Sequence, residues 1–281
     1  MRMTVLIEND SPAAGADLTA EFGLSLLFDL DGTQILFDTG DSGVFADNAS
    51  RLGFDIAGVD LAVLSHQHFD HGGGLARFLE LNDHAPVYLR RAEHADRFSR
   101  FPDRTQPIGI DLGLLERRPD RFVELEETTE ISPGVTLVMA AGFRHPRPPG
   151  NDRLLVLRDD QLVADDFDHE LTMVLHDDDG MVVVTGCSHS GVLNMIDAAV
   201  EQFPGQRLKA VVGGFHLIGL PAADSMALSR PEVEDIGREI RARCDGPIFT
   251  GHCTGHKAFG VLEDILGDQL HPLSIGATTE I

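Results

Sequence analysis

Three histidines and an aspartate stand within six residues of the stretch LSHQHFDHGGG, in a chain that has only thirteen histidines. His66 and His68 are two apart at the end of an apolar run, and side chains two apart in an extended chain leave on the same face. Both can therefore reach one ion. Asp70 and His71 follow where the chain turns toward a helix, so they can serve a second ion about 3.5–4 Å from the first.

Three later segments repeat the layout of an apolar strand, a glycine and then a histidine. They are VVVTGCSHSG with His189, AVVGGFHL with His216, and PIFTGHCTGH with His252 and His256. Polar residues gathered at strand ends commonly form ligand sites, and imidazole with carboxylate favours zinc-like metals. A solvated histidine-rich turn is the alternative for any one segment. The recurrence at several strand ends favours a metal site, and His256 is interpreted as the first residue of a helix.

Apolar periodicity predicts the elements that must position these residues. Strands are expected at 3–8, 23–30, 34–40, 61–66, 86–90, 135–142, 153–157, 169–176, 181–186, 208–214, 247–251 and 270–276, and helices at 42–54, 75–83, 91–101, 192–203, 231–244 and 256–267. Two β-rich halves interspersed with helices imply two sheets with helices outside them. We expect a single domain over 1–281, with a lid or insertion at about 102–134, where proline, glycine and charge replace the pattern.

The chain carries a net charge of −24, with 46 acidic and 22 basic residues. Such a surface repels phosphate backbones and anionic membranes, so we expect neither a nucleic-acid nor a membrane partner. Its self-repulsion destabilises a compact chain unless salt screens it, which indicates a salt-loving cytoplasm. The sequence contains no signal-peptide pattern and no long apolar run, so a cytoplasmic location is expected. Three cysteines without a CxxC pair exclude a disulfide framework.

HxHxDH after an apolar strand, with FDTG upstream at 37–40, resembles the metallo-β-lactamase-fold superfamily. That resemblance implies the α/β (α+β) class, a four-layer αββα sandwich of two mixed β-sheets flanked by helices, and one or two metal ions. The trio TGCSHSG, GGFHL and TGHCTG resembles the 7,8-dihydropterin-6-methyl-4-(β-D-ribofuranosyl)aminobenzene 5′-phosphate synthase-like branch. The similarity runs from about residue 3 to about residue 276.

The resemblance implies six metal ligands, which are His66, His68 and His189 for one ion and Asp70, His71 and His252 for the other. Asp70 is also a candidate proton acceptor in catalysis. Cys187 stands where many members have a metal-bridging aspartate, so it is either a ligand or a small residue lining the pocket. Asp38 is expected to orient the metal loop, because a carboxylate behind a ligand fixes its tautomer.

Substrate contacts are expected from His216 and from Thr250, Gly251 and Thr254, whose glycine-rich turn could bring backbone amides to an anionic group. The chain also departs from the branch. Phe143 replaces an acidic residue, and His169 in DDFDHE replaces an aspartate. His145 is a rival to His189 as the third ligand of the first ion.

The resemblance implies an enzyme with two divalent ions, zinc first and manganese or iron as alternatives. His68 stands where di-iron reductases of this fold carry a glutamate, which favours zinc. The expected substrate is a phosphorylated or diphosphorylated small molecule, in either a hydrolase or a transferase reaction. A general metallo-hydrolase of an ester, thioester or phosphodiester is the first alternative, and a non-catalytic metal-binding protein is the second. The sequence leaves the oligomeric state open.

Overall fold

The computed structural model describes residues 1–11, 17–139, 142–219 and 225–281. The chain divides into two compact units, each built from separate segments. Unit 1 comprises Met1–Glu126, Arg153–His169 and Ser274–Ile281, and unit 2 comprises Glu127–Asp152 and Glu170–Leu273. Because each unit is assembled from distant parts of the chain, no single cut would separate them. The expectation of one domain over 1–281 stays a prediction.

Unit 1 is built on a seven-stranded mixed sheet in the order β18-β1-β2-β3-β4-β5-β8. The strands are β1 Arg2–Ile7, β2 Ser25–Leu30, β3 Thr33–Phe37, β4 Leu61–Val63, β5 Val87–Arg90, β8 Phe122–Leu125 and β18 Thr278–Glu280. Strands β3, β4, β5 and β8 run parallel, so their carboxyl ends meet at one edge. In register, Phe37 pairs with Val63, which places the residues that follow β3 and β4 side by side.

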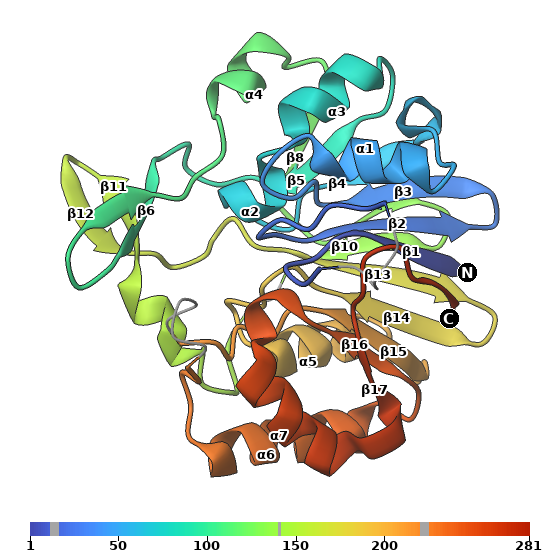
Figure 1. Ribbon diagram of the computed structural model, residues 1–281, viewed down its shortest axis with the longest axis vertical. Helices are drawn as coiled ribbons and strands as arrows, with labels where there is room; N and C mark the ends of the chain where they lie inside the picture. Colours follow the sequence, from blue (N-terminus) through green and yellow to red (C-terminus); the bar gives the residue numbers. More distant parts are fainter. Residues whose placement is uncertain (12–16, 140–141, 220–224) are drawn as a thin grey trace. The chain divides into compact units, whose positions relative to one another are not determined.

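Helices α1 (Val44–Arg51) and α3 (Leu75–Leu81) lie over one face of this sheet (Figure 1). Leu75, Phe78 and Leu79 follow the i, i+3, i+4 spacing of an amphipathic helix and are all buried. They join Phe45 of α1 and Leu36 of β3 in one apolar cluster. The short helix α2 (Phe69–Gly72) and the 3-10 turn η1 (Ile56–Gly58) complete this part of unit 1.

A second, four-stranded sheet in unit 1 has the order β12-β11-β6-β7. Its strands are β6 Arg97–Arg100, β7 Thr105–Pro107, β11 Leu154–Arg158 and β12 Gln161–Ala164. The expected helix over 91–101 is wrong, because this stretch contains β6. Side chains alternate there, with Arg97 and Ser99 buried, and both residues pair with β11. Pairing with a distant strand and the burial of Arg97 outweigh the local helical spacing.

Unit 2 is built on a seven-stranded mixed sheet in the order β17-β16-β15-β14-β13-β10-β9. The strands are β9 Thr129–Ser132, β10 Val135–Val138, β13 Thr172–Asp177, β14 Gly180–Val184, β15 Leu208–Gly213, β16 Ile248–Thr250 and β17 Leu270–Pro272. Strands β14 to β17 are parallel, so the loops after β14, β15 and β16 leave from one edge. The strand expected at 135–142 is observed at β10, and Ala140 and Ala141 lie outside the described residues.

Helices α5 (Val192–Gln202), α6 (Arg230–Arg243) and α7 (His256–Leu266) lie over one face of this sheet (Figure 1). Ile196 of α5, Ile240 of α6 and Leu262 of α7 belong to one buried cluster with the strands. A capping box between Ser229 and Glu232 starts α6. The 3-10 turns of this unit are η2 Pro149–Arg153, which ends one residue into unit 1, η4 His252–Thr254 and η5 Gly267–Gln269.

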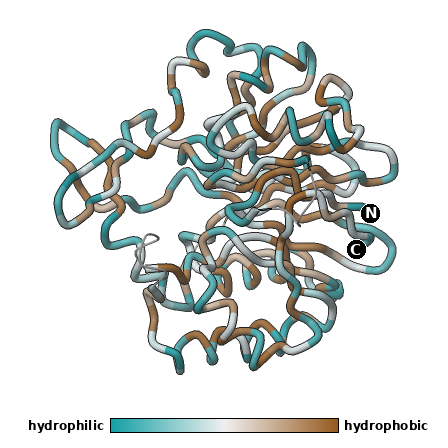
Figure 2. Tube along the Cα trace, in the orientation of Figure 1, coloured by the Kyte–Doolittle hydropathy of each residue, from teal (hydrophilic) through white to brown (hydrophobic). Residues whose placement is uncertain are grey.

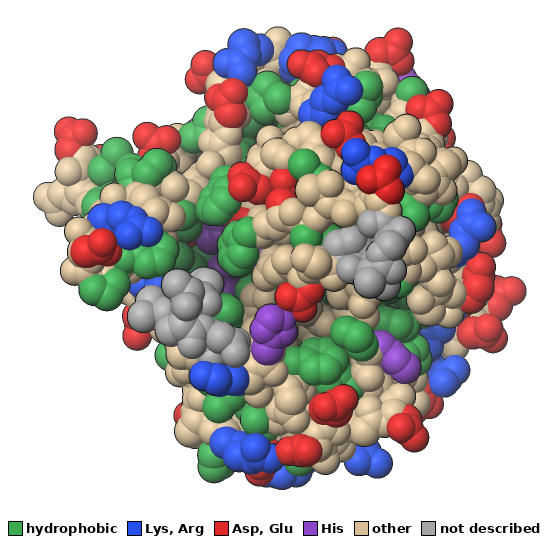
Figure 3. All heavy atoms as spheres, viewed as in Figure 1, with side chains coloured by type: hydrophobic (Ala, Val, Ile, Leu, Met, Phe, Trp, Pro, Cys, Tyr) green, Lys and Arg blue, Asp and Glu red, His purple; other side chains and the backbone are tan. Residues whose placement is uncertain are grey.

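The expectation of two mixed sheets flanked by helices is confirmed in the two units. Hydropathy follows this plan, since many segments of the two seven-stranded sheets have the brown colour of hydrophobic residues in the trace (Figure 2). The segment 102–134 contains β7, helix α4 (Gly113–Arg117), β8 and β9, and its role as a lid stays a prediction. Figure 3 shows acidic side chains spread among basic ones over the visible face. Among the described residues, none of the helices is both long and apolar enough to cross a membrane.

Candidate metal centre

Three histidines of unit 1 converge where the loop after β4 enters α2, with His66 and His68 in the loop and His71 in the helix. The ring centroid of His66 lies 4.6 Å from that of His68 and 4.2 Å from that of His71. None of the three side chains is appreciably exposed. Asp70 is also buried, and its Oδ2 lies 3.8 Å from Nε2 of His71. Because the loop leaves the end of a parallel strand and enters a helix within six residues, all four side chains stay close together.

Asp38 stands directly behind this loop, at the end of β3, and its backbone has a positive φ of 59°. Its carboxylate accepts hydrogen bonds from the backbone N–H of Ser65 at 2.7 Å, from the Ser65 hydroxyl at 2.7 Å and from Nδ1 of His71 at 2.6 Å. Since Nδ1–H of His71 is donated to Asp38, Nε2 of that ring carries the lone pair. Backbone strain of this kind collects at functional sites.

The same carboxylate fixes the tautomer of His66 through Ser65. A hydroxyl has a single hydrogen, and Ser65 donates it to Asp38. Its oxygen lies 2.9 Å from Nδ1 of His66, so it accepts the proton of that nitrogen. Nε2 of His66 is then a lone-pair donor, as Nε2 of His71 is. One buried aspartate therefore prepares two imidazoles for ligation.

His169 supports the backbone of the histidine loop. Its Nδ1 accepts the backbone N–H of Gln67 at 3.0 Å, so its proton is on Nε2, which lies 3.3 Å from the Asp165 carboxylate. Arg97 donates to the Gln67 side chain at 2.8 Å and lies 3.5 Å from Asp165. Although burial alone would raise it, the pKa of Asp165 is lowered by the hydrogen bond from His169 and by nearby histidines.

Burial first, and the neighbouring His169 second, lower the pKa of His68 to about 3, against the opposing charge of Asp70. His68 is therefore neutral at pH 7. A neutral imidazole is the form that binds a metal ion. The donor atoms of His68, Asp165 and His169 lie within 4.8 Å of one another. Since His169 already accepts one hydrogen bond and donates another, it acts here as a support of the loop.

In unit 2, His189 follows β14 and is held from two sides. Its Nδ1 lies 3.0 Å from Oδ1 of Asn151, which can only accept, so Nε2 again carries the lone pair. The Asn151 amide also donates to the His189 carbonyl at 2.8 Å. The buried Glu170 accepts the backbone N–H groups of His189 and Ser190, each at 2.7 Å. Burial raises the pKa of Glu170, and these hydrogen bonds favour its charged form.

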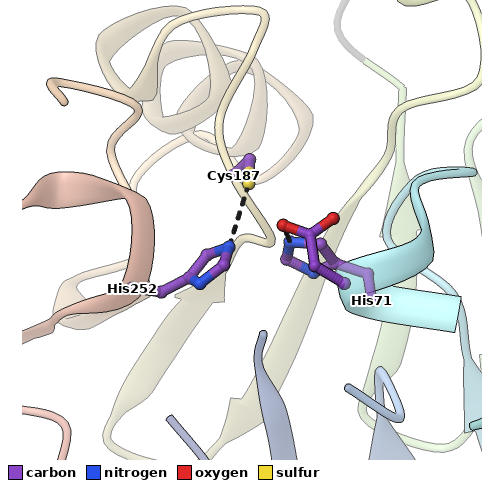
Figure 4. A group of neighbouring side chains, drawn as sticks. His71, Cys187 and His252 are labelled. Atoms are coloured by element: carbon purple, nitrogen blue, oxygen red, sulfur yellow. Dashed lines mark hydrogen bonds and ion pairs between the residues drawn. The ribbon is translucent and has the colours of Figure 1, made fainter. Parts of the chain in front are cut away.

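Cys187 and His252 meet at the carboxyl ends of β14 and β16. The Cys187 sulfur lies 3.4 Å from Nε2 of His252, and both side chains are buried. Figure 4 shows this contact, and it shows His71 projecting from α2. His252 has a positive φ of 49° at the start of η4. A donor atom of Cys187 also lies within 4.8 Å of one of His189, so unit 2 gathers sulfur and imidazole at one sheet edge.

The predicted substrate residues lie near these donors. Thr250 and Thr254 are fully buried and bonded to each other at 2.6 Å. Thr250 also donates to the Gly213 carbonyl at 2.7 Å, and Thr254 accepts the backbone N–H of Phe215 at 3.0 Å. Both hydroxyls thus hold the ends of β15 and β16 together, with Gly251 between them. Their contact with a substrate stays a prediction, as does that of His216.

Unit 2 also contains a pocket of about 360 Å³ beside the loop that carries His189. Its wall is largely apolar, and its residues are His145, Pro146, Arg147, Pro148, Pro149, Gly191, Val192, Leu193, Phe215, Leu217, Leu228, Glu232, Asp235, Ile236 and Glu239. Nε2 of His145 lies 3.0 Å from the Asp197 carboxylate. Within the described residues His145 is in none of the donor clusters, so its rivalry with His189 gains no support.

Sequence reasoning missed four residues that hold the loops, namely the buried Arg97, Asp165 and Glu170 and the partly buried Asn151. For His169, the sequence indicates only that a histidine replaces an aspartate of the family pattern. A signal was present for Asp165 and Glu170, because acidic residues on both sides of a histidine in DDFDHE are uncommon before an apolar strand. No comparable signal marked Arg97, which lies in a stretch rich in exposed charge.

Comparisons with known proteins indicate which family this chain is similar to. The family profile described as the metallo-beta-lactamase superfamily matches residues 18–189. A curated protein of Methanocaldococcus jannaschii, named 7,8-dihydropterin-6-methyl-4-(beta-D-ribofuranosyl)-aminobenzene-5'-phosphate synthase, is 26% identical over 275 residues, which cover 92% of this chain and 89% of that protein.

Among solved structures, Tm1679, described as a metal-dependent hydrolase of the beta-lactamase superfamily, is 30% identical. It superposes with a TM-score of 0.81 over 100% of this chain and 99% of its own. A diphosphatase of the PhnP family shares 14% identity, with a TM-score of 0.54 over 100% of this chain and 97% of its own, which indicates a shared fold.

Proposed function

Because this chain belongs to the metallo-beta-lactamase superfamily, we propose that it is a metal-dependent enzyme acting on a phosphorylated or diphosphorylated small molecule. The proposed chemistry is that of the dihydropterin synthase-like branch. The family match supports the fold and the metal dependence, and it spans residues of both units. The curated relative named as a synthase supports the substrate class.

The proposed metal ligands are His66, His68 and His189 for one ion and Asp70, His71 and His252 for the other, with Cys187 beside them. The hydrogen bonds of the Nδ1 atoms are the observation that carries this proposal. Asp38, Ser65 and Asn151 accept the Nδ1 protons of three different imidazoles, and each ring is left with a lone pair on Nε2. Buried acceptors placed behind imidazoles are typical of metal ligands.

The donor set also fits the chemistry of a divalent ion. Five imidazoles and one carboxylate suit zinc, and they are compatible with manganese or iron. The low pKa of His68 keeps its ring neutral at pH 7, so no proton has to leave before an ion binds. Asp70 supplies negative charge, and His71 lies close to it.

A pair of bound divalent ions would supply Lewis acidity at a phosphoryl or carbonyl oxygen and a lowered pKa for a coordinated water. The chain itself provides orientation and proton acceptance. Asp38 fixes two ligand rings, Glu170 fixes the backbone on which His189 stands, and Asp70 is the carboxylate proposed to take up a proton during the reaction. No serine or cysteine nucleophile is required.

The charge of the chain argues that the ions, rather than the protein surface, attract the phosphate. With 46 acidic against 22 basic residues and a net charge of −24, the protein surface as a whole repels an anionic group. The pocket in unit 2 carries Glu232, Asp235 and Glu239, which disfavour a phosphate there. We therefore assign the neutral or cationic part of the substrate to that pocket.

A general metallo-hydrolase is the second candidate, and the 30% identity to a protein described as a metal-dependent hydrolase favours it. The two candidates share one centre and differ in what attacks the substrate. Water attacks in a hydrolase, whereas an organic nucleophile displaces diphosphate in a synthase. Release of diphosphate that depends on an added ribofuranosyl-aminobenzene phosphate, the group in the name of the curated relative, would identify the synthase.

The test combines elemental analysis with turnover. Protein purified without added metal should hold at least two divalent ions per chain, and it should cleave a generic phosphodiester or release diphosphate. His71→Ala should lose metal and activity together. His84→Ala, at an exposed histidine, is the matched control and should keep both. A metal-loaded protein with no turnover of either substrate would favour the non-catalytic alternative, and a metal-free protein would contradict the proposal.

A further inference from the structure

Cys187, His216 and Cys253 form a cluster of soft donors that lies wholly within unit 2. One donor atom from each residue lies within 4.8 Å of the other two. Their exposed fractions are 3%, 4% and 3%. They stand in the loops after β14, β15 and β16, whose carboxyl ends are neighbours in the parallel part of the sheet. The topology of the unit therefore brings them together.

The environment of His216 indicates that this cluster is a binding site. Among the described residues, neither of its ring nitrogens has a hydrogen-bond partner of normal geometry, and the ring interacts with the Cys253 side chain. Leaving a buried polar group without a full set of partners is unfavourable. Its backbone also has a positive φ of 48°, which is rare for a residue with a side chain. Buried polar atoms and a strained backbone at one residue are typical of binding sites.

The surroundings of Cys253 suit a sulfur ligand. The backbone N–H of His216 points at its Sγ over 3.3 Å, and a donor in this position stabilises a thiolate. A Cβ atom at Gly214 would lie only 2.5 Å from that sulfur, so the close packing requires glycine. Gly150 plays the same part for His216, since a Cβ there would lie 3.0 Å from Nε2. The absence of a side chain at Gly214 and at Gly150 therefore lets Cys253 and His216 occupy these positions.

We propose that Cys253 and His216, together with Cys187, which stands beside the six ligands proposed above, form a further site for one thiophilic divalent cation, such as Zn²⁺ or Cd²⁺. Zinc binds thiolate at about 2.3 Å and imidazole at about 2.0–2.1 Å, so small side-chain movements would bring the three donors to one ion. Two thiolates neutralise the charge of the cation, which lowers the free-energy cost of burying that cation. Three protein ligands leave a fourth position open, as in catalytic zinc sites. The proposal holds whether or not the proposed catalytic activity is correct.

Cobalt titration of the metal-free protein tests this site, because thiolate ligands give Co²⁺ a near-ultraviolet charge-transfer band that imidazole and carboxylate do not. The wild type should show the band of two thiolates. Cys187→Ser and Cys253→Ser should each show about half of it. Cys244→Ser is the matched control and should leave it unchanged, since Cys244 is a buried cysteine that bonds only the Gly246 carbonyl within the described residues.

A band that is absent, or unchanged in Cys253→Ser, would overturn the proposal. The double variant His66→Ala with His71→Ala separates it from the proposed function. In that variant the band should persist while the metal bound by the other ligands is lost. If Cys253→Ser does not fold, the ¹¹³Cd resonance of the wild type decides instead, because two sulfur ligands shift it strongly downfield. A cadmium resonance in the range of nitrogen and oxygen ligands alone would also overturn the proposal.

Discussion

The Asp38 carboxylate lies 2.6 Å from Nδ1 of His71, and neither side chain is exposed to solvent. Asp38 follows β3 and His71 lies in α2, which the loop after the neighbouring strand β4 leads into. The hydrogen bond between Asp38 and Nδ1 of His71 therefore leaves the lone pair of the His71 ring on Nε2 and fixes the direction of that ring. The proposed binding of a metal ion by His71 depends on this hydrogen bond.

Replacing Asp38 should weaken metal binding without removing a ligand. Asp38→Asn keeps the size of the side chain but loses the charge that orders His71 and, through Ser65, His66. Loss of such a supporting carboxylate costs about 10–100-fold in metal affinity. Competition with a chromophoric chelator measures this. Asp103→Asn, at an exposed aspartate, is the control. Equal affinities for wild type and Asp38→Asn would contradict the role given to Asp38.

Replacing His169 should destabilise the histidine loop. His169→Ala leaves the buried backbone N–H of Gln67 without its acceptor. An unsatisfied buried donor costs about 1–3 kcal/mol in the free energy of unfolding. Urea unfolding of the metal-free protein measures the loss, and His84→Ala should stay within about 0.5 kcal/mol of the wild type. A His169→Ala variant as stable as that control would show that the loop does not need this support.

The stability of the metal-free protein should rise with pH in the acid range. Burial lowers the pKa of His68 to about 3, whereas an unfolded histidine takes up its proton near pH 6.5. Between these values the unfolded chain binds more protons, so stability grows with pH by up to about 1.4 kcal/mol per pH unit from this residue. Burial lowers the pKa of His169 too, and its contribution has the same sign.

His68→Gln should flatten this dependence, while His84→Gln should not. Urea unfolding at several pH values between about 4 and 6 gives the slope in each variant. Identical slopes in His68→Gln and the wild type would mean that His68 is not held neutral by the fold.

Salt should stabilise the chain. A net charge of −24 repels itself, and the acidic side chains visible over the surface in Figure 3 are screened as ionic strength rises. We expect the Tm to climb steadily from low salt to molar potassium chloride. Sucrose at matched viscosity is the control for non-ionic effects. A flat Tm over this range would remove the inference of a salt-loving cytoplasm.

The strands that carry the candidate ligands could be predicted because each is a short apolar run that ends in glycine and histidine. This signal is contained within about ten consecutive residues of each segment. The pairing of β6 with β11 could not be predicted, because Ser99 and Leu154 lie far apart in the chain and the spacing around Ser99 is compatible with a helix. Contacts of this kind override local preference.

The supporting residues divide in the same way. Asp38 could be assigned to the loop from its position after a strand in FDTG. Arg97 could not, since a buried arginine beside an aspartate is invisible until the fold places Asp165 next to it. Asn151 was missed for a similar reason, because its partner His189 lies in a different segment of unit 2.

Elemental analysis of the protein purified without added metal, together with His66→Ala and His71→Ala, tests the central claim most directly. The account predicts at least two divalent ions per chain, a loss of about one ion in each variant, and no loss in His84→Ala. A metal content near zero in the wild type, or one that neither ligand variant changes, would contradict it.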